Sequence, residues 1–425
     1  MHDTLLLDPV KILHGPGTEL QQGPALIESG VLTGFGDEAR TAAAQLGVQA
    51  TAAPQQLLAP CLVDPHTVLP SPISGPTETI SSLRRCAAAG GYGQVALLPR
   101  GQSWRDQPER LIGLQNTDPA SVHLSLWGSF SREGRGKELA PHGDLLEHGA
   151  IGLADDDAVV PLPLLERGLL LGEMGSCPVL VAPRDPILQG EGMLREGVAT
   201  LRAGWTPDPL ISELLPVQQL LALQQRHPER QLRLMNLSTA AAIDVLSQAD
   251  HRLKASVCWW HLLVDGSDLS STDPGCRVRP SLGGAADRRS LRAALQSGVI
   301  QAVAVHAIPL DDEDMLLPAD QRPPGLSGHH LVLPALWSAL VDQGDLSIEA
   351  LWGVLSFGPS AFLDQPAESL RRGSRRWLLF DPEASWTVDR DDPAAPGAAN
   401  LPWLGHTMQG RVVACGLSRL GDRNG

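Results

Sequence analysis

The sequence predicts an α/β fold, a (β/α)8 TIM barrel with a small β-sandwich domain formed by the N- and C-terminal segments. Strand-like apolar runs alternate with helical segments between residues 58 and 361, as in a parallel sheet closed into a barrel. Short strands and turns occupy both ends of the chain instead. The 425 residues, 43% of them hydrophobic, can bury one large core and a smaller one. We therefore assign 58–361 to the barrel, and 1–57 with 362–425 to the composite β domain.

The two ends of the chain carry the pattern of strands joined by turns. At the N-terminus, Thr4–Leu7 and residues 24–32 are apolar runs, and a Glu-Ser-Gly turn in the second indicates a β-meander. After the barrel, Trp377–Pro382 and Gly410–Ala414 are the clearest strands, with a loop rich in Pro, Ala and Gly between them at 391–399. We expect both ends to share one small domain.

Between the ends, the barrel is predicted from repeated pairs of a strand and a helix. The expected strands are apolar runs at Gln94–Leu98, Ala150–Leu153, Pro178–Val181, Leu232–Leu234, Ala255–Cys258 and Ile300–Val305. Amphipathic stretches such as Leu210–Gln225 and Arg288–Gln296 have the period of helices that cover a sheet. This alternation favours parallel strands over a sandwich of two antiparallel sheets.

Composition argues against several classes of function. The net charge of -15 and the pI near 5.3 argue against a nucleic-acid partner, which normally selects a basic face. Neither a positively charged n-region nor a long apolar stretch is visible, so we expect a cytoplasmic protein that does not bind membranes. The six cysteines form no Cys-x-x-Cys pair, which predicts reduced, mostly buried thiols rather than a zinc-thiolate cluster or a disulfide framework.

Several motifs follow one another in an order that points to one family. They are Leu62–His66, Gly149–Asp156, Leu237–Thr239, Pro280–Leu282 and Asn400–Gly405. Through them the chain resembles the dihydroorotases, members of the metal-dependent amidohydrolase superfamily, over nearly its whole length. The resemblance implies a barrel of amidohydrolase type. It also implies a zinc site at the carboxyl ends of the strands, built from histidines, a carboxylate or carbamylated lysine, and a final aspartate that acts as base.

Most of those family residues are replaced in this chain. By the resemblance, His66 stands for the first metal-binding histidine, and the replaced family positions are Val68, Pro70, Ala182, Asn236, Gly283 and Val305. Val68, Ala182 and Asn236 stand for histidines, Pro70 and Gly283 for arginines, and Val305 for the aspartate. An ungapped alignment of the last strand instead puts His306 in the aspartate's place. Because valine and alanine cannot ligate a metal, we expect no tight binuclear zinc site and no cofactor.

A few candidate side chains remain, and some of them have two interpretations. His66 is either a metal ligand or a hydrogen-bonded structural residue, and His306 has chemistry suited to a general base. Asp155 and Asp156 either supply a bridging carboxylate or bind local backbone donors in a turn. Arg100 stands where the family has a substrate-binding asparagine. The pair His329–His330 and the acidic run 311–314 are expected in solvated loops.

The leading hypothesis is a dihydroorotase homologue that has lost catalysis and serves pyrimidine biosynthesis as a structural or regulatory subunit. The resemblance implies aspartate carbamoyltransferase as its partner, and a homo-oligomer is possible. The alternative is an active hydrolase that interconverts dihydroorotate and carbamoyl aspartate with a reduced zinc site of His66, His306 and Asp155 or Asp156. A third reading makes Arg100 the binding residue for a small regulatory anion.

Overall fold

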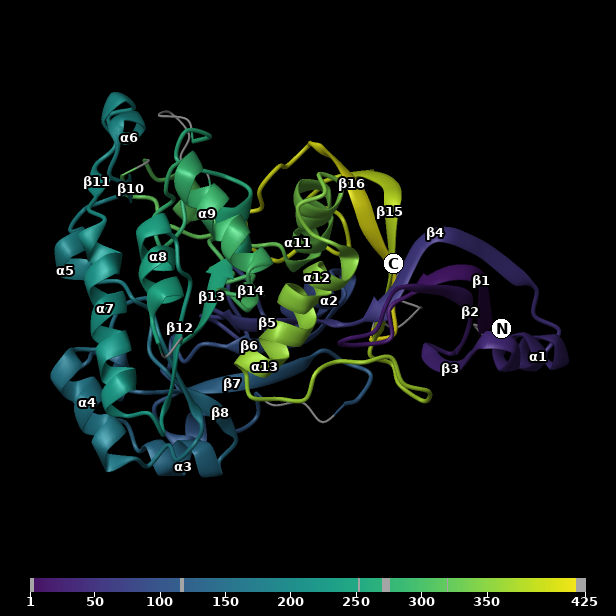
Figure 1. Ribbon diagram of the computed structural model, residues 1–425, viewed down its shortest axis with the longest axis horizontal. Coiled ribbons are helices and arrows are strands. Elements are labelled where there is room, and N and C mark those ends of the chain that lie inside the picture. The colour runs from purple at the N-terminus through teal and green to yellow at the C-terminus, as the bar shows by residue number, and fades with distance from the viewer. Residues whose placement is uncertain (1–3, 115–117, 251–252, 270–275, 319, 418–425) are drawn as a thin grey trace.

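The computed structural model describes residues 4–114, 118–250, 253–269, 276–318 and 320–417. Figure 1 shows a barrel ringed by helices, with a second sheet beside it that carries both ends of the chain. Eight parallel strands follow the order β14-β13-β12-β9-β8-β7-β6-β5. This architecture confirms the predicted (β/α)8 barrel and the small domain formed by the two ends.

The barrel strands are short and nearly all their residues are buried. They are β5 (Leu62–Thr67), β6 (Tyr92–Leu97), β7 (His123–Ser129), β8 (Ala150–Ala154), β9 (Pro178–Val181), β12 (Gln231–Leu234), β13 (Lys254–Cys258) and β14 (Ala302–Ala304). The six runs expected from the sequence each overlap one of them. β7 was not among the expected runs, because His123 to Leu126 alternate polar and apolar residues. The strand is nevertheless buried on both faces from Leu124 onward.

Helices surround the barrel and are labelled in Figure 1 where there is room. They are α2 (Ile80–Ala89), α3 (His142–Glu147), α4 (Leu162–Leu171), α5 (Pro186–Gln189), α6 (Val198–Arg202), α7 (Ile211–Arg226), α8 (Ala240–Gln248), α9 (Ala285–Gln296), α10 (Asp312–Leu316), α11 (His329–Leu336), α12 (Ile348–Trp352) and α13 (Gly358–Phe362). Side-chain caps fix several helix starts: Thr79 accepts a bond from the Ser82 amide, and Thr239 from the Ala242 amide. No helix in the described part of the chain is long and apolar enough to cross a membrane.

The second sheet combines strands from before and after the barrel. Its order is β16-β15-β4-β1-β2-β3, with β1 (Thr4–Ile12), β2 (Gln21–Glu28), β3 (Val31–Phe35), β4 (Ala50–Pro60), β15 (Trp377–Thr387) and β16 (Thr407–Cys415). The first three strands form the expected meander, followed by α1 (Gly36–Gln45). β15 pairs antiparallel with β4, so the end of the chain completes a sheet begun at its start.

The barrel is filled by its own interior side chains. Val63, Ala96, Trp127 and Leu180 are buried there, and Phe362 of α13 belongs to the same cluster. A larger apolar cluster includes residues from both the strands and the surrounding helices. The ends of the barrel sheet are tied by a bond from the Val68 amide to the Ala307 carbonyl. The interior is therefore a core, and chemistry is confined to its ends.

The expectation of a solvated loop at His329 and His330 was wrong. Both residues begin helix α11 and are buried. His329 Nε2 lies 2.9 Å from Asp64 Oδ2, and Asp64 Oδ1 accepts a bond from the Val305 amide. Asp64 of the Asp-Pro-His motif therefore joins β5 to α11 and to the end of β14.

Candidate functional site

Two histidines meet where β5 and β14 end. His66 Nδ1 lies 3.0 Å from His306 Nδ1, and His66 Nε2 lies 2.8 Å from the hydroxyl of Ser256 on β13. Both imidazole rings are buried. Because each nitrogen of His66 already has a partner within the protein, neither is left to bind a metal ion.

Burial keeps this pair of histidines uncharged. It lowers the pKa of His66 well below the usual range, with the nearby His306 adding to the effect. It also lowers the pKa of His306 to about 4, although the charge of Asp157 opposes the shift. At neutral pH one Nδ1 therefore carries a hydrogen and donates it to the other. His306 also holds a left-handed backbone at φ 47°, a conformation that is costly for a residue with a β-carbon.

Beside His306 lies a cavity of about 10 Å³, which we call the barrel-mouth cavity. It is lined by Asp157, Ala182, Pro183, Arg184, Met235, Asn236, Pro280 and His306. His306 Nε2, Asp157 Oδ2 and both side-chain amide atoms of Asn236 are buried without a hydrogen-bond partner. A cavity of this volume with such polar walls suits about one water molecule. Its volume is far below the roughly 300 Å³ of the smallest typical ligand pockets.

An ion pair fills the space around this cavity. Arg184 Nη2 lies 2.9 Å from Asp157 Oδ1, and Arg184 also donates to the Asp157 carbonyl and to Gln189. Burial alone would raise the pKa of Asp157, but the charges of Arg184, Arg279 and Arg100 lower it overall. Neither Asp157 nor Arg184 was singled out from the sequence. The available signal was the run of three aspartates after β8, which does not tell which one faces the mouth.

The two aspartates chosen from the sequence have other partners. Asp155 accepts bonds from Ser129 Oγ, from the amides of Phe130 and Ser131, and from Ser131 Oγ. Burial raises the pKa of Asp155 to about 6, and these bonds oppose the shift. Asp156 lies 3.4 Å from Nη1 of Arg100, at a partly exposed position. The structure thus pairs Arg100 with Asp156 and bonds Asp155, which follows β8, to the segment at the end of β7.

The replaced family positions lie around the same end of the barrel. Ala182 and Asn236 line the barrel-mouth cavity. Val68, Gly283 and Val305 are buried in the segments that follow the barrel strands, and Pro70 is half-buried. Within the described residues, no three His, Cys, Asp or Glu side chains gather to hold a metal ion. The donor atoms present here therefore do not fit the two-zinc site that the family resemblance implies.

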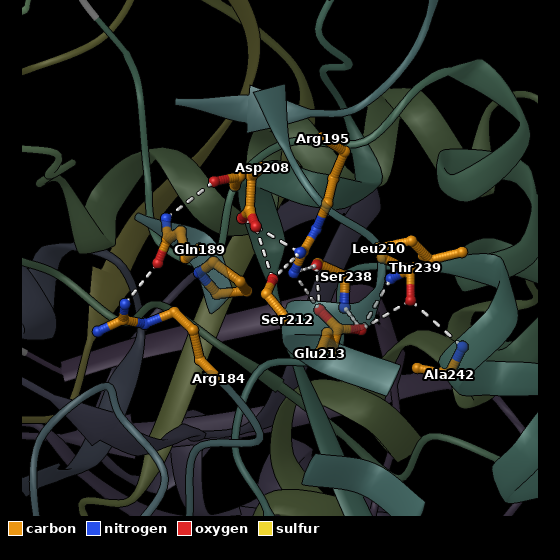
Figure 2. Close-up of polar contacts among 12 residues, drawn as sticks. Arg184, Gln189, Arg195, Asp208, Leu210, Ser212, Glu213, Ser238, Thr239 and Ala242 are labelled. Atoms are coloured by element: carbon orange, nitrogen blue, oxygen red, sulfur yellow. Dashed lines mark hydrogen bonds and ion pairs between the residues drawn. The ribbon is translucent and has the colours of Figure 1, made fainter. Parts of the chain in front are cut away.

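A buried polar network lies next to the mouth and explains the Ser-Thr motif. Figure 2 shows Glu213 of α7 facing Arg195, Ser238 and Thr239. Glu213 Oε2 lies 2.7 Å from Arg195 Nη2, and Glu213 Oε1 accepts bonds from the Ser238 and Thr239 amides at the start of α8. Asp208 is the second carboxylate near Arg195, at 3.1 Å. The motif therefore anchors the loop after β12, whatever occupies the mouth.

One further buried histidine, His261, has a structural partner. His261 is buried in the turn after β13, and its Nε2 donates to the Pro280 carbonyl at 3.0 Å. Burial lowers its pKa to about 4. This bond joins the turn after β13 to the Pro-Ser-Leu segment.

Comparisons with known proteins were made by sequence and by structure. No family model matches the chain. It is 34% identical over 392 residues to a probable dihydroorotase-like protein of Synechocystis, covering 84% of this chain and 87% of the relative. It is 28% identical to a dihydroorotase of Pelobacter propionicus, with 92% of each chain covered.

The barrel and its companion sheet also match solved structures. The L-hydantoinase of Arthrobacter aurescens superposes with a TM-score of 0.78 at 18% identity, covering 97% of this chain and 94% of that one. Sequence and architecture thus agree over nearly the whole chain. The protein belongs to the dihydroorotase-like family of amidohydrolases.

Proposed function

We propose that this protein is a dihydroorotase-like subunit that does not hydrolyse the substrate ring and supports pyrimidine biosynthesis as a structural or regulatory partner of aspartate carbamoyltransferase in the cytoplasm. The observation that carries the proposal is the barrel-mouth cavity of about 10 Å³. Dihydroorotate, with its ring and carboxylate, cannot enter that space. The fold supplies a stable surface for a partner.

The side chains at the mouth support the same conclusion. An amidohydrolase needs a polarised water held against the scissile amide, and zinc supplies it through about three ligands and an open position. Here His66 is bonded to Ser256 and His306, and Arg184 occupies the mouth through its ion pair with Asp157. Arg184 and Asp157 already balance each other's charge, so neither charge requires a bound substrate to neutralise it.

A test of inactivity measures zinc and turnover in the same preparation. We expect no stoichiometric zinc by mass spectrometry, and no interconversion of dihydroorotate and carbamoyl aspartate in either direction. A dihydroorotase purified in parallel serves as the positive control. Stoichiometric zinc together with turnover contradicts the proposal.

A test of partnership mixes the purified chain with aspartate carbamoyltransferase from the same cell and measures complex formation by analytical ultracentrifugation. Surface positions for this test come from helix α6, where Val198 and Leu201 lie on one face and are each 65% exposed. The tryptophans offer less surface, because Trp127, Trp337 and Trp352 are buried and Trp104 is half-buried. A mixture that sediments as separate species contradicts the partnership.

A second candidate is a cyclic-amide hydrolase with a single zinc ion or none. The observation that favours it is His306, whose Nε2 has no partner and which lines the barrel-mouth cavity. This activity requires Arg184 to leave the mouth so that a substrate can approach His306. It predicts turnover that falls with His306→Asn, and chelation of zinc separates the form with one metal ion, which loses activity, from the form without metal, which keeps it. The leading proposal predicts no turnover to lose.

A further inference from the structure

The opposite end of the barrel holds a hollow of about 380 Å³, which we call the lower pocket. It lies beside the first residues of β12 and β13, and its wall includes Arg230, Gln231, Arg233, Asp250 and Lys254. Its volume is within the range of small-molecule sites, roughly 300–1,000 Å³. The lower pocket thus has a larger volume than the barrel-mouth cavity, and its volume is large enough for a small metabolite.

Two cations stand side by side in this wall. Arg233 and Lys254 are register partners in the parallel pairing of β12 with β13. Lys254 Nζ donates to the Ala361 carbonyl of α13 at 2.7 Å, and Arg233 Nη1 reaches the same oxygen at 3.4 Å. Like charges on neighbouring strands destabilise a sheet. The closeness of the two cations is therefore unfavourable, and a bound anion can offset this cost.

Neither of these two cations has an ion-pair partner among the described residues. The other contacts of Arg233, which is 1% exposed, are the side-chain oxygen of Gln231 at 2.7 Å and the Phe362 ring. Burial lowers the pKa of Arg233 to about 10 and also lowers that of Lys254, while the charge of Asp364 partly opposes both shifts. The buried charge of Arg233 is unfavourable without a carboxylate unless another anion approaches it, and the ammonium of Lys254 beside it is partly exposed.

The third cation of the pocket differs from these two. Arg230 donates to the carbonyls of Leu169 and Gly175 near the end of α4, and it lies 3.3 Å from Glu229. Its charge is therefore already used to stabilise a helix end. The carboxylates to be weighed against an anion are Asp250 in the wall and Asp364 on the exposed chain beyond α13.

We propose that the lower pocket binds the phosphate group of a small metabolite between Arg233 and Lys254. A phosphate presents several acceptor oxygens, so the planar guanidinium and the ammonium can donate to different ones. The bound anion attracts both cations and so offsets the repulsion between them. The rest of the pocket leaves room for the organic part of the ligand. This inference is independent of what happens at the barrel mouth.

The test uses inorganic phosphate as the probe, titrated into the full chain by calorimetry at constant ionic strength set with chloride. We expect saturable binding that weakens about tenfold or more in Lys254→Gln, which loses one charge-assisted contact. The matched control is Lys137→Gln, an exposed lysine in the loop after β7, which should bind as the unmodified protein does. The variant Asp364→Asn removes a competing carboxylate at an exposed position and should tighten binding.

A second readout exploits the scarcity of lysine, because the chain has only Lys11, Lys137 and Lys254. Acetylation with a lysine reagent, followed by mass spectrometry, measures each site separately. Phosphate should slow the acetylation of Lys254 several-fold and leave Lys11 and Lys137 unchanged. The proposal is overturned if phosphate does not bind, if Lys254→Gln binds it as tightly as the unmodified protein, or if all three lysines are protected equally.

Discussion

The guanidinium of Arg184 lies 2.9 Å from the carboxylate of Asp157, and both side chains line the barrel-mouth cavity together with Ala182 and Asn236. Both side chains are about nine-tenths buried. Arg184 comes from the loop after β9 and Asp157 from the loop after β8. The pair therefore links two neighbouring loops at this end of the barrel.

Removing one partner of this pair should be costly. We expect Asp157→Asn to lower the free energy of unfolding by about 3 kcal/mol, because Arg184 is left buried without a counter-charge. Asp156→Asn is the matched control, since Asp156 is more exposed and its contact with Arg100 is longer, and should cost at most about 1 kcal/mol. Urea unfolding measures both. Equal losses in the two variants would contradict the assigned role of Arg184.

The histidine pair predicts a specific dependence on pH. The pKa of His306 is about 4 in the folded protein, against an ordinary value of 6.5. Between pH 4 and pH 6.5, the unfolded chain therefore binds a proton at this ring that the folded protein does not. Its contribution to stability is complete above pH 6.5 and is lost as the pH falls towards 4. Asp155, with its pKa raised to about 6, acts in the opposite direction. The overall curve therefore sums opposing effects, and a variant is needed to isolate His306.

His306→Asn provides that comparison. The stability advantage of the unmodified protein over this variant should shrink by up to roughly 1.4 kcal/mol per pH unit between pH 6.5 and 4. Urea unfolding at several pH values gives the difference directly. If the His306 difference is constant with pH, the ring does not change its protonation on folding.

Glu213 should be among the costliest single carboxylates to replace. Glu213→Gln removes the counter-charge of Arg195 and weakens the bonds that hold Ser238 and Thr239 at the start of α8. We expect a loss of about 3 kcal/mol in the free energy of unfolding. The exposed Glu229→Gln should change stability by less than about 1 kcal/mol. A loss below about 1 kcal/mol for Glu213→Gln would mean that Asp208 alone can balance Arg195.

Two helical glycines should respond in opposite ways to alanine. A β-carbon at Gly358 would lie 1.8 Å from the Gln301 carbonyl oxygen, whereas one at Gly353 would meet nothing within 4 Å. Gly358→Ala should lower stability by about 3 kcal/mol or more because α13 must move away from the barrel. Gly353→Ala should raise it by about 0.5–1 kcal/mol through reduced backbone freedom in the unfolded chain. Thermal unfolding distinguishes the two, and a tolerant Gly358→Ala would show that α13 is not held against Gln301.

Partner binding through α6 can be tested with one charge. Leu201→Glu should weaken association with aspartate carbamoyltransferase at least tenfold without lowering thermal stability, because the side chain is exposed. Leu316→Glu on α10 is a matched control, since this leucine is exposed too but lies on another helix. Equal weakening by both variants would point to a general charge effect rather than to contact at α6.

Local sequence patterns predicted most of the fold. Strands such as Pro178–Val181 are short apolar runs between helical segments, and a parallel barrel strand buried on both faces has that pattern. β7 lacks it, because polar Ser125 and Ser129 are buried within the strand, where Ser125 bonds to Gln94. The limits of the two domains stay predictions, although β4 runs on to Pro60 without a break.

The candidate site was harder to predict than the fold. The motifs named the replaced positions, and Ala182 and Asn236 do line the cavity. They could not reveal the ion pair of Arg184 with Asp157 at the barrel mouth. Nor could they reveal the contact between Asp64 on β5 and His329, because these residues are 265 positions apart in sequence. Which of three consecutive aspartates faces an arginine likewise depends on loop conformation. Such contacts leave no periodic signal in the sequence.

The pairing of β15 with β4 has a consequence for synthesis in the cell. β4 is complete at Pro60, but its antiparallel partner starts only at Trp377, after the whole barrel has been translated. At about 5–20 residues per second, the edge of β4 waits on the order of tens of seconds for that partner. An open strand edge is a site for wrong pairing with other chains. The nascent chain is thus exposed to aggregation at β4, a strand synthesised before the barrel. A ribosome-bound chaperone that shields residues 50–60 would raise the yield of folded protein.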